Sequence, residues 1–204
     1  MTISFPRALP AVTYIKADFF QIDAYGSSSA GRQQNVIQVR DTAWQADMVT
    51  RPLRYSVMAE VEAWWLSLRG GLRSCLFVHP HALWPKQHYA GNSPASDAGN
   101  LVSVSNGNVL SVESVDSGLS LSIGDRIGLE EGALRAIGRV VDFSGSGTTR
   151  SIEIEPAPPA DVAVADAVVR FASPSLVMRP VHGSFSVSGE GLYTVSFSLI
   201  ESRI

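Results

Sequence analysis

Cysteine is nearly absent from this sequence, and its scarcity excludes two kinds of site. The 204 residues include one cysteine, Cys75. A single cysteine can form neither an intrachain disulfide nor a cysteine zinc site. Cys75 begins an apolar run that continues to Val78, so we predict a small buried side chain there and no reactive thiol.

Charge of either sign is also scarce. Charged residues make up 17% of the chain, whereas an average domain has about 25%. The formal net charge is −3, and no lysine or arginine occurs from Gln87 to Asp125. Nucleic-acid binding needs clustered basic residues, so we expect no such function. The low charge is typical of a strand-and-turn protein or of one that buries surface in an assembly.

Long apolar stretches are missing as well. No uncharged apolar run approaches the roughly 18 residues of a membrane-spanning helix. Residues 1–10 lack the apolar core of a signal peptide, and Pro6 and Pro10 favour an extended arm there. The sequence therefore predicts a chain that is made and folds in the cytoplasm, without membrane insertion.

The histidines form one candidate metal site. His79 and His81, with His88 nearby, could share a metal if the first two lay on one face of a strand. Pro80 disrupts such a strand, however, and no carboxylate is close in the sequence. We therefore favour a polar exit from a strand over a metal site.

The acidic pairs do not form a candidate active site. Glu130-Glu131, followed by Gly132, is typical of a solvated turn, and Glu153 and Glu155 share the outward face of an alternating strand. The sequence contains no nucleophile elbow, phosphate loop or dinucleotide-binding motif. We predict no catalytic residue, no metal and no cofactor.

One helix is predicted, over residues 57–69. Ser56 is the expected N-cap, and Gly70-Gly71 form the expected C-terminal stop. Apolar side chains recur at helical spacing on one face, namely Val57, Val61, Trp64 or Trp65, and Leu68. We expect this face to pack on a sheet, and we interpret the tryptophans as packing residues in preference to a ligand platform.

Strands and turns fill the rest of the chain. Before the helix we expect strands at 12–15, 36–40 and 44–49, with a polar, mobile loop from Ala24 to Gln33. Residues 82–100, rich in proline and glycine, predict a linker. Six short strands follow, separated by turns that include Asn106-Gly107. We place these strands at 101–104, 109–115, 126–129, 136–141, 151–155 and 167–171.

The last predicted element is a β-hairpin. Ser184–Ser188 and Tyr193–Leu199 flank a turn at Gly189–Gly191, with apolar side chains on one face and serines on the other. Together the elements predict a mainly β fold. Residues 1–92 and 172–204 form a discontinuous β-domain, a split β-barrel or sandwich with one α-helix, and residues 93–171 form an inserted small β-barrel.

The order and spacing of several motifs resemble the distal tail proteins of long-tailed, siphovirus-like bacteriophages and of phage-like gene transfer agents. The resemblance covers most of the chain. The motifs are Phe5-Pro6, Ala63–Gly71 leading into Leu76-Phe77 and Pro80, Ile123–Leu129, the region Ile154–Pro159, and the terminal Phe197–Glu201.

The resemblance implies a structural virion protein at the distal end of the tail. Such proteins form a homohexameric ring, made mainly by the first β-domain, which joins the tail tube protein to the hub or baseplate. Their inserted barrel, OB-like or galectin-like in some members, projects outward. Tail fibres and the tape-measure protein are further candidate partners, and DNA is expected only to pass through the lumen.

Subunit contacts are expected at the N-terminal arm, at the loop Ala24–Gln33 and at the serine-rich hairpin. The candidate contact residues are Phe5, Pro6, Arg7, Ser184, Ser186 and Ser188. The alternative is a receptor- or carbohydrate-binding tail module that acts through the insert and needs a pocket lined by aromatic side chains. The insert itself offers only Phe143 and Phe171. A tail-tip hydrolase is a third class, which the sequence does not favour.

Overall fold

The structure is a computed structural model that describes all residues except 1, 7–8, 10–11, 31–32, 90–97 and 203–204. Between Asp23 and Asp41 it describes the backbone alone. The described chain is mainly β with one α-helix, as predicted, and it divides into two compact units. The first contains Pro6–Cys75 and Met178–Ser202, and the second contains Thr2–Phe5 and Leu76–Val177.

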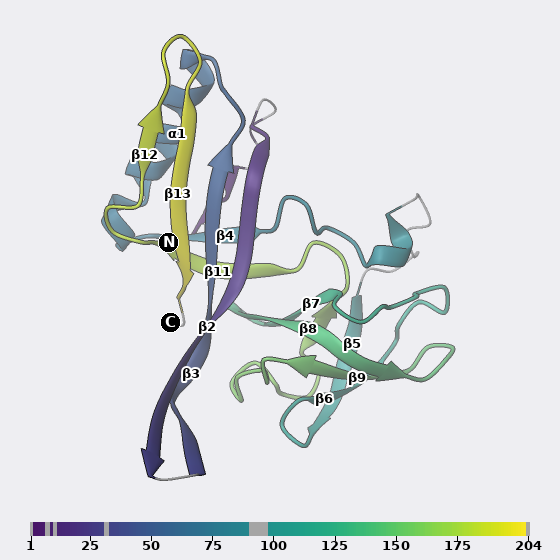
Figure 1. The fold of residues 1–204 in the computed structure, drawn as a ribbon. Helices are drawn as coiled ribbons and strands as arrows, with labels where there is room; N and C mark the ends of the chain where they lie inside the picture. Colours follow the sequence, from purple (N-terminus) through teal and green to yellow (C-terminus); the bar gives the residue numbers. More distant parts are fainter. Residues whose placement is uncertain (1, 7–8, 10–11, 31–32, 90–97, 203–204) are drawn as a thin grey trace. The chain divides into compact units, whose positions relative to one another are not determined.

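One sheet holds the strands outside the barrel (Figure 1). Its order is β1-β4-β11-β13-β3-β2, and β12 pairs with β13. The strands are β1 Thr2–Ser4, β2 Tyr14–Ala30, β3 Gln33–Thr50, β4 Ser74–Val78, β11 Ser175–Pro180, β12 Ser186–Ser188 and β13 Thr194–Glu201. The boundary between the two units falls within β4 and β11.

Strands β12 and β13 form the predicted C-terminal hairpin. They pair antiparallel, with Val187 opposite Val195. Buried positions alternate with half-buried ones along β13, and the buried side chains are Val195, Phe197 and Leu199. This period of two, read from the sequence, correctly identifies the core face of the strand.

The helix α1 spans Tyr55–Ser67 and is followed by a 3-10 turn, η2, at Arg69–Gly71. Both glycines of η2 have positive φ angles, 63° and 103°, which glycine adopts without strain, so the predicted stop is confirmed. The predicted N-cap is wrong. Arg54 occupies the cap position and makes no side-chain cap hydrogen bond, while Ser56 lies inside the first turn.

The helix packs on β13 through the predicted face. Val61 is fully buried, and Met58, which the sequence interpretation left out, is buried beside it. The ring centroids of Trp64 and Trp65 lie 5.5 and 5.6 Å from that of Phe197. Both tryptophans therefore serve in helix–sheet packing, as predicted.

The predicted mobile loop from Ala24 to Gln33 is wrong. Apart from residues 31–32, this segment continues β2 and begins β3 as a long antiparallel hairpin, paired as far as Ala30↔Gln33. Strand β3 carries β-branched residues at Val36, Ile37 and Val39, which favour extended backbone. Hydrogen bonds to β3 hold the serine-rich end of β2 in an extended conformation as well. Strand formation depends on the paired segment and not only on local composition.

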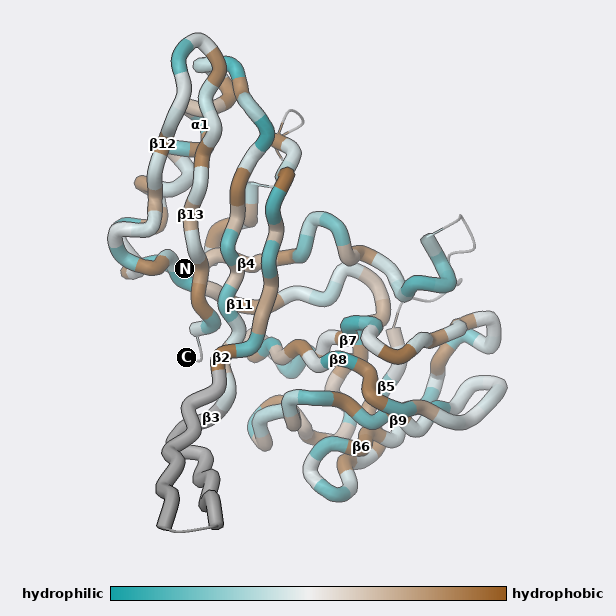
Figure 2. Tube along the Cα trace, viewed as in Figure 1, coloured by the Kyte–Doolittle hydropathy of each residue, from teal (hydrophilic) through white to brown (hydrophobic). Residues whose placement is uncertain are grey.

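The second unit contains a closed six-stranded barrel in the order β10-β5-β6-β9-β8-β7. Its strands are β5 Ala98–Ser105, β6 Val109–Glu113, β7 Arg126–Glu131, β8 Leu134–Ser144, β9 Arg150–Glu155 and β10 Val168–Arg170. All six predicted short strands are therefore confirmed. Figure 2 shows apolar and polar positions interleaved along these strands, and the fully buried apolar residues include Leu110, Ile127, Leu129, Ile152 and Ile154.

The structure tests two turns that the sequence predicts in the barrel. Asn106 and Gly107 have positive φ angles of 52° and 82°, as the predicted turn requires. The solvated turn predicted at Glu130-Glu131 is wrong, because β7 runs through both residues. Glu130 is held between Arg135 and Arg170 by ion pairs of 3.3 and 3.2 Å.

Candidate functional site

The chain that leaves β4 forms a loop, His79–Tyr89, which is attached to the barrel. The backbone N–H of Lys86 donates to Asp125 Oδ1 at 3.0 Å, and Lys86 Nζ donates to the carbonyl oxygen of Ile123 at 2.7 Å. The short helix η3, Lys86–His88, supplies a further contact, in which His88 Nε2 accepts the N–H of Ser120 at 2.9 Å. These hydrogen bonds fix the loop on the barrel segment that precedes β7.

Asp125 organises this attachment. Its side chain is buried, and its second oxygen, Oδ2, accepts the backbone N–H of Ser122 at 2.7 Å. A buried carboxylate is costly unless hydrogen bonds satisfy it, and two backbone donors do so here. Asp125 is therefore a structural clamp between the loop and the barrel, which gives the Ile123–Leu129 motif a local role.

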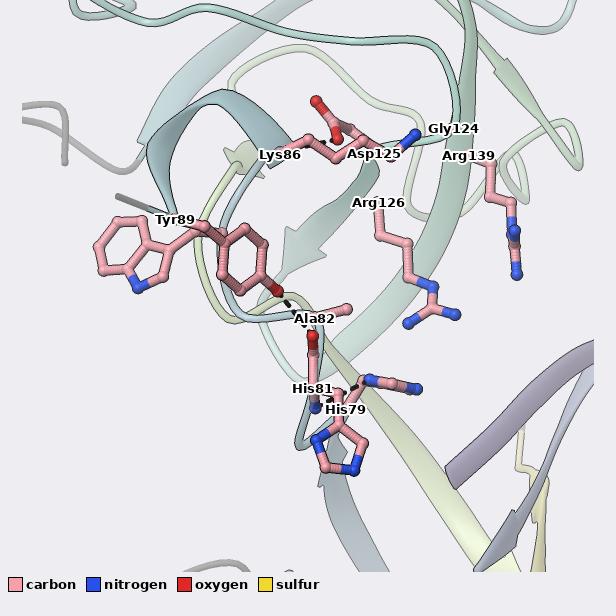
Figure 3. Close-up of a pocket in the computed structure, with 10 residues that line it drawn as sticks. His79, His81, Ala82, Lys86, Tyr89, Gly124, Asp125, Arg126 and Arg139 are labelled. Atoms are coloured by element: carbon pink, nitrogen blue, oxygen red, sulfur yellow. Dashed lines mark hydrogen bonds between the residues drawn. The ribbon is translucent and has the colours of Figure 1, made fainter. Parts of the chain in front are cut away.

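A cavity of about 340 Å³ lies between the loop and the barrel (Figure 3). The loop supplies His79, His81, Ala82, Trp84, Lys86 and Tyr89, and the barrel supplies Gly124, Asp125, Arg126 and Arg139. All these residues belong to the second unit. The cavity is thus built from two segments that are far apart in the sequence.

Internal hydrogen bonds hold the loop wall of the cavity in place. The hydroxyl of Tyr89 donates to the carbonyl oxygen of His81 at 2.7 Å and accepts the N–H of Leu83 at 2.9 Å. The N–H of His81 donates to His79 Nδ1 at 3.1 Å, and the two imidazole rings lie 6.1 Å apart. These hydrogen bonds hold the loop wall of the cavity together.

The barrel wall presents two arginines. Arg126 on β7 and Arg139 on β8 occupy directly opposed positions in the antiparallel ladder, and Figure 3 shows both side chains extending in the same direction from the barrel. Burial and, to a lesser extent, the neighbouring charge of Arg139 together lower the pKa of Arg126 to about 10. Among the described residues that line the cavity are three cationic side chains, those of Lys86, Arg126 and Arg139, and the carboxylate of Asp125.

The predicted histidine cluster is only partly brought together. His79 and His81 are neighbours at the cavity, whereas His88 is buried and directs Nε2 to Ser120. Among the described residues, no group of three or more histidine, cysteine, aspartate or glutamate side chains is placed to hold a metal ion. Cys75 is buried, and burial raises the pKa of its thiol to about 12. A buried hydrophobic role for Cys75 is confirmed.

The residues predicted for subunit contact lie in two places. Phe5 is buried, with its ring 5.0 Å from that of Phe77, and Pro6 is buried as well. Arg7 lies outside the described residues. Contact of this arm with another subunit stays a prediction.

The three serines differ in their surroundings. The hydroxyl of Ser184 donates to the carbonyl oxygen of Val181 at 2.8 Å and accepts the N–H of Ser198 at 3.0 Å, so it closes the hairpin. Ser186 and Ser188 are exposed on β12, and Ser186 Oγ lies 2.8 Å from Ser196 Oγ. Their contact with another subunit also stays a prediction.

Sequence reasoning missed the cavity for an identifiable reason. The stretch without lysine or arginine, Gln87–Asp125, argues against a nucleic-acid groove, yet Lys86 and Arg126 border it on either side and the fold brings both to one cavity. Trp84 and Tyr89 lie outside residues 93–171 and were not counted as aromatic residues available to the barrel. The sequence signal for the cavity was the presence of basic residues at the ends of two segments that are far apart in the sequence.

No protein-family model matches the chain, and no curated protein matches it. No helix in the described part of the chain is long and apolar enough to cross a membrane.

Proposed function

We propose that this chain is a structural virion protein of a phage tail tip, which assembles into a ring between the tail tube and the hub or baseplate. Two observations carry the proposal: β2 is the last strand in the order of its sheet, and the far end of the β2–β3 hairpin is a two-stranded ladder. The number of subunits, six, and the tail partners come from the motif resemblance. The proposal assigns no catalytic step to the chain.

Strand β2 is the last strand in the order of its sheet, and it has 17 residues. Within the described residues, the pairing of β2 is with β3 alone. Ile15 is 67% exposed and Phe20 is 40% exposed on this strand. A long edge strand with exposed apolar side chains is a template for pairing with another chain. Lys16 and Asp18 of the same strand form an exposed ion pair at 3.1 Å.

The far end of the hairpin has still less support from its own chain. Within the described residues, β3 pairs with β13 from Gln45 to Val49, and Ala24–Ala30 and Gln33–Arg40 form a two-stranded arm. An isolated two-stranded hairpin is marginally stable in water. Docking on a neighbouring subunit would stabilise the arm, and we define Ala24–Arg40 as the β2–β3 arm.

An arm on one side of a subunit and a receiving surface on another side make a heterologous contact. Repetition of such a contact closes into a ring when the rotation between subunits allows it. A tube-end connector requires this type of assembly. The proposed function therefore uses the β2 edge and the β2–β3 arm as the main assembly elements, with Ser186 and Ser188 as further candidate contacts.

The test compares the wild-type chain with a short-arm variant. In this variant Asn-Gly replaces Ser27–Val36, so that a two-residue turn connects Gly26 to Ile37, which are paired in the native ladder. We expect the wild type to form rings, alone or with tail tube and hub proteins, by light-scattering mass and negative-stain microscopy. The short-arm variant should keep its circular dichroism spectrum and lose the rings.

A full-length arm carrying Ser28→Ala serves as the matched control and should assemble as the wild type does. A wild-type chain that stays monomeric with both tail partners contradicts the ring proposal. A short-arm variant that forms normal rings contradicts the role of the arm. Ring formation would then depend on the edge of β2.

A further inference from the structure

We propose that Asn106 is a site of covalent self-modification, at which the side-chain amide is lost as ammonia and the residue becomes aspartate or isoaspartate. Asn106 and Gly107 form the turn between β5 and β6 of the barrel. The reaction consumes water and needs no cofactor. The ring proposal does not use this turn, so the two proposals succeed or fail independently.

The reaction is an attack by a backbone nitrogen on the preceding side chain. The nitrogen of Gly107 bonds to Cγ of Asn106, the Cγ–Nδ2 bond breaks, and the backbone amide proton leaves with the side-chain nitrogen as ammonia. The product is a cyclic imide, a succinimide. Water then opens the imide at either carbonyl carbon, which gives aspartate or isoaspartate. No group is oxidised or reduced.

Gly107 presents an accessible nitrogen for this attack. An ideal Cβ placed on Gly107 would meet no described atom within 4 Å, and glycine has no side chain to shield the nitrogen. The hydrogen bond across the turn is donated by the N–H of Asn108 to the carbonyl oxygen of Ser105, at 3.3 Å. The N–H of Gly107 can therefore lose its proton without breaking that bond.

Asn106 lies in a conformation that selects the reactive pair. The φ angles of Asn106 and Gly107 are 52° and 82°, and a two-residue hairpin turn with positive φ at both positions favours Asn-Gly. Closure of the imide requires Asn106 to rotate its backbone. Ser105, Asn106 and Gly107 are all exposed, so the end of the hairpin has space for this rotation and water reaches the amide.

Asn100, in the same hairpin, lacks these features. It lies in β5 and is paired with Glu113 of β6 and Val168 of β10. The nitrogen that follows it, that of Leu101, donates to the carbonyl oxygen of Ala167 at 2.9 Å, and Leu101 is buried. Attack by this nitrogen would break a hydrogen bond inside the barrel, so we expect Asn100 to keep its amide.

Asn108 is protected in another way. Its Nδ2 donates to Glu153 Oε1 at 3.3 Å and to Glu155 Oε1 at 3.0 Å, which holds the side chain against β9. The next residue is Val109, whose β-branched side chain crowds the nitrogen that would attack. Of these three asparagines, the structure therefore favours reaction at Asn106.

The modification should change the barrel near the turn. Each conversion adds a negative charge to a chain whose net charge is −3. Isoaspartate also lengthens the backbone of a turn whose length sets the register of β5 and β6. Asn108 follows this turn, and its carbonyl oxygen accepts the N–H of Ile154 at 3.0 Å. We expect this link between the turn and β9 to weaken.

The experiment incubates the full chain at neutral and at mildly alkaline pH. Peptide mass spectrometry follows Asn100, Asn106 and Asn108 separately, and enzymatic methylation of isoaspartate distinguishes the two products. We expect loss of the amide at Asn106, faster at alkaline pH because the attacking nitrogen must lose its proton, and retention of the amide at the other two. Equal loss at Asn100 or Asn108 overturns the selection of Asn106 by the structure.

Variants locate the reaction. Asn106→Gly keeps a residue that accepts positive φ and removes the amide, so isoelectric focusing should no longer show the acidic shift of the wild type. Asn100→Gln is the matched control, because it removes a different exposed asparagine of the same hairpin, and it should acidify as the wild type does. An undiminished acidic shift in Asn106→Gly overturns the assignment.

The chain unfolded in guanidinium chloride is the reference for the reactivity of the Asn-Gly pair itself. The proposal is overturned if the folded chain keeps the amide of Asn106 throughout an incubation in which the unfolded chain loses it, since the turn would then protect the pair. Hydrogen exchange at the amides of Asn108 and Ile154 tests the structural consequence. Equal protection of these amides before and after modification overturns the weakened link to β9.

Discussion

Arg126 and Arg139 stand opposite each other in the ladder between β7 and β8, at the wall of a cavity. Cross-strand neighbours of like charge are unfavourable in a sheet. Burial and the charge of Arg139 both lower the pKa of Arg126, to about 10, from an ordinary value of 12.5. The pair therefore reduces the stability of the barrel, and sites that reduce stability are often retained for a function.

Arg126→Gln should stabilise the protein. At neutral pH Arg126 is charged both in the folded and in the unfolded chain, and its lowered folded-state pKa means that this charge is disfavoured on folding. Removal of one of two opposed like charges should raise the free energy of unfolding by about 0.2–1 kcal/mol. Thermal unfolding at low and high salt provides the measurement, with a smaller difference at high salt. A variant less stable than the wild type at low salt would contradict the account.

Glu130→Gln should destabilise the barrel. Glu130 joins Arg135 on β8 to Arg170 on β10, and its carboxylate also accepts from Ser175 Oγ at 3.3 Å. Loss of the negative charge leaves two partly buried guanidinium groups without their shared carboxylate, which should cost about 1–3 kcal/mol. Chemical denaturation gives the free energy of unfolding. Glu113→Gln, at an exposed position of β6, is the matched control and should change it little.

Regular strands were the most predictable part of the fold. The barrel strands contain short alternating segments bounded by glycine and asparagine, and hydrophobic period and turn chemistry are local properties of the sequence. The same is true of β13, where Val195, Phe197 and Leu199 are buried at a spacing of two. The boundaries proposed for an inserted domain, 93 and 171, remain a prediction, although all six barrel strands lie between them.

The failures share a physical cause, which is that partners distant in sequence decided the local structure. Ala24–Ala30 is polar and glycine-containing, and it is extended because β3 pairs with it. Glu130 lies close to the turn at Gly132, yet it is half-buried beside Arg170, which is 40 positions away in the sequence. The predicted cap at Ser56 failed because the helix begins two residues earlier than predicted, at Tyr55, a small shift that local propensity cannot resolve.

The cavity was unpredictable for the same reason. Lys86 and Arg126 are separated by the stretch that lacks basic residues, and hydrogen bonds from Lys86 to Asp125 and Ile123 bring their segments together. A motif such as Ile123–Leu129 indicates that a segment has a specific role. It does not indicate which distant loop the segment holds.

Alkaline pH should destabilise the wild type more than a Cys75→Ala variant. Burial raises the pKa of the Cys75 thiol from 9.0 to about 12. Because the folded-state pKa is the higher one, the stability contributed by the neutral thiol is complete below pH 9.0 and is lost as the pH rises to about 12. In this window the free energy of unfolding of the wild type should fall relative to the variant by about 1.4 kcal/mol per pH unit.

The measurement is denaturant unfolding of both proteins at several pH values in that window. Comparison with Cys75→Ala is necessary because burial also raises the pKa of Tyr14, and tyrosine ionisation affects both proteins. Parallel curves for the two proteins would show that Cys75 is more accessible to ionisation in the folded chain than its burial implies.

Phe197→Ala should unfold the helix–sheet layer of the first unit. Phe197 is 2% exposed, and its ring contacts those of Trp64 and Trp65 at centroid distances of 5.5 and 5.6 Å. Truncation of a buried phenylalanine costs about 3–5 kcal/mol, a large share of the stability of an ordinary domain. Hydrogen exchange should show lost protection in α1 and β13 of the first unit and retained protection in the barrel strands. Leu66→Ala removes a side chain that is 68% exposed on the same helix and should leave exchange unchanged. If both variants lose protection alike, or if the barrel amides exchange as fast as those of α1, then the packing of Phe197 does not hold this layer separately from the barrel.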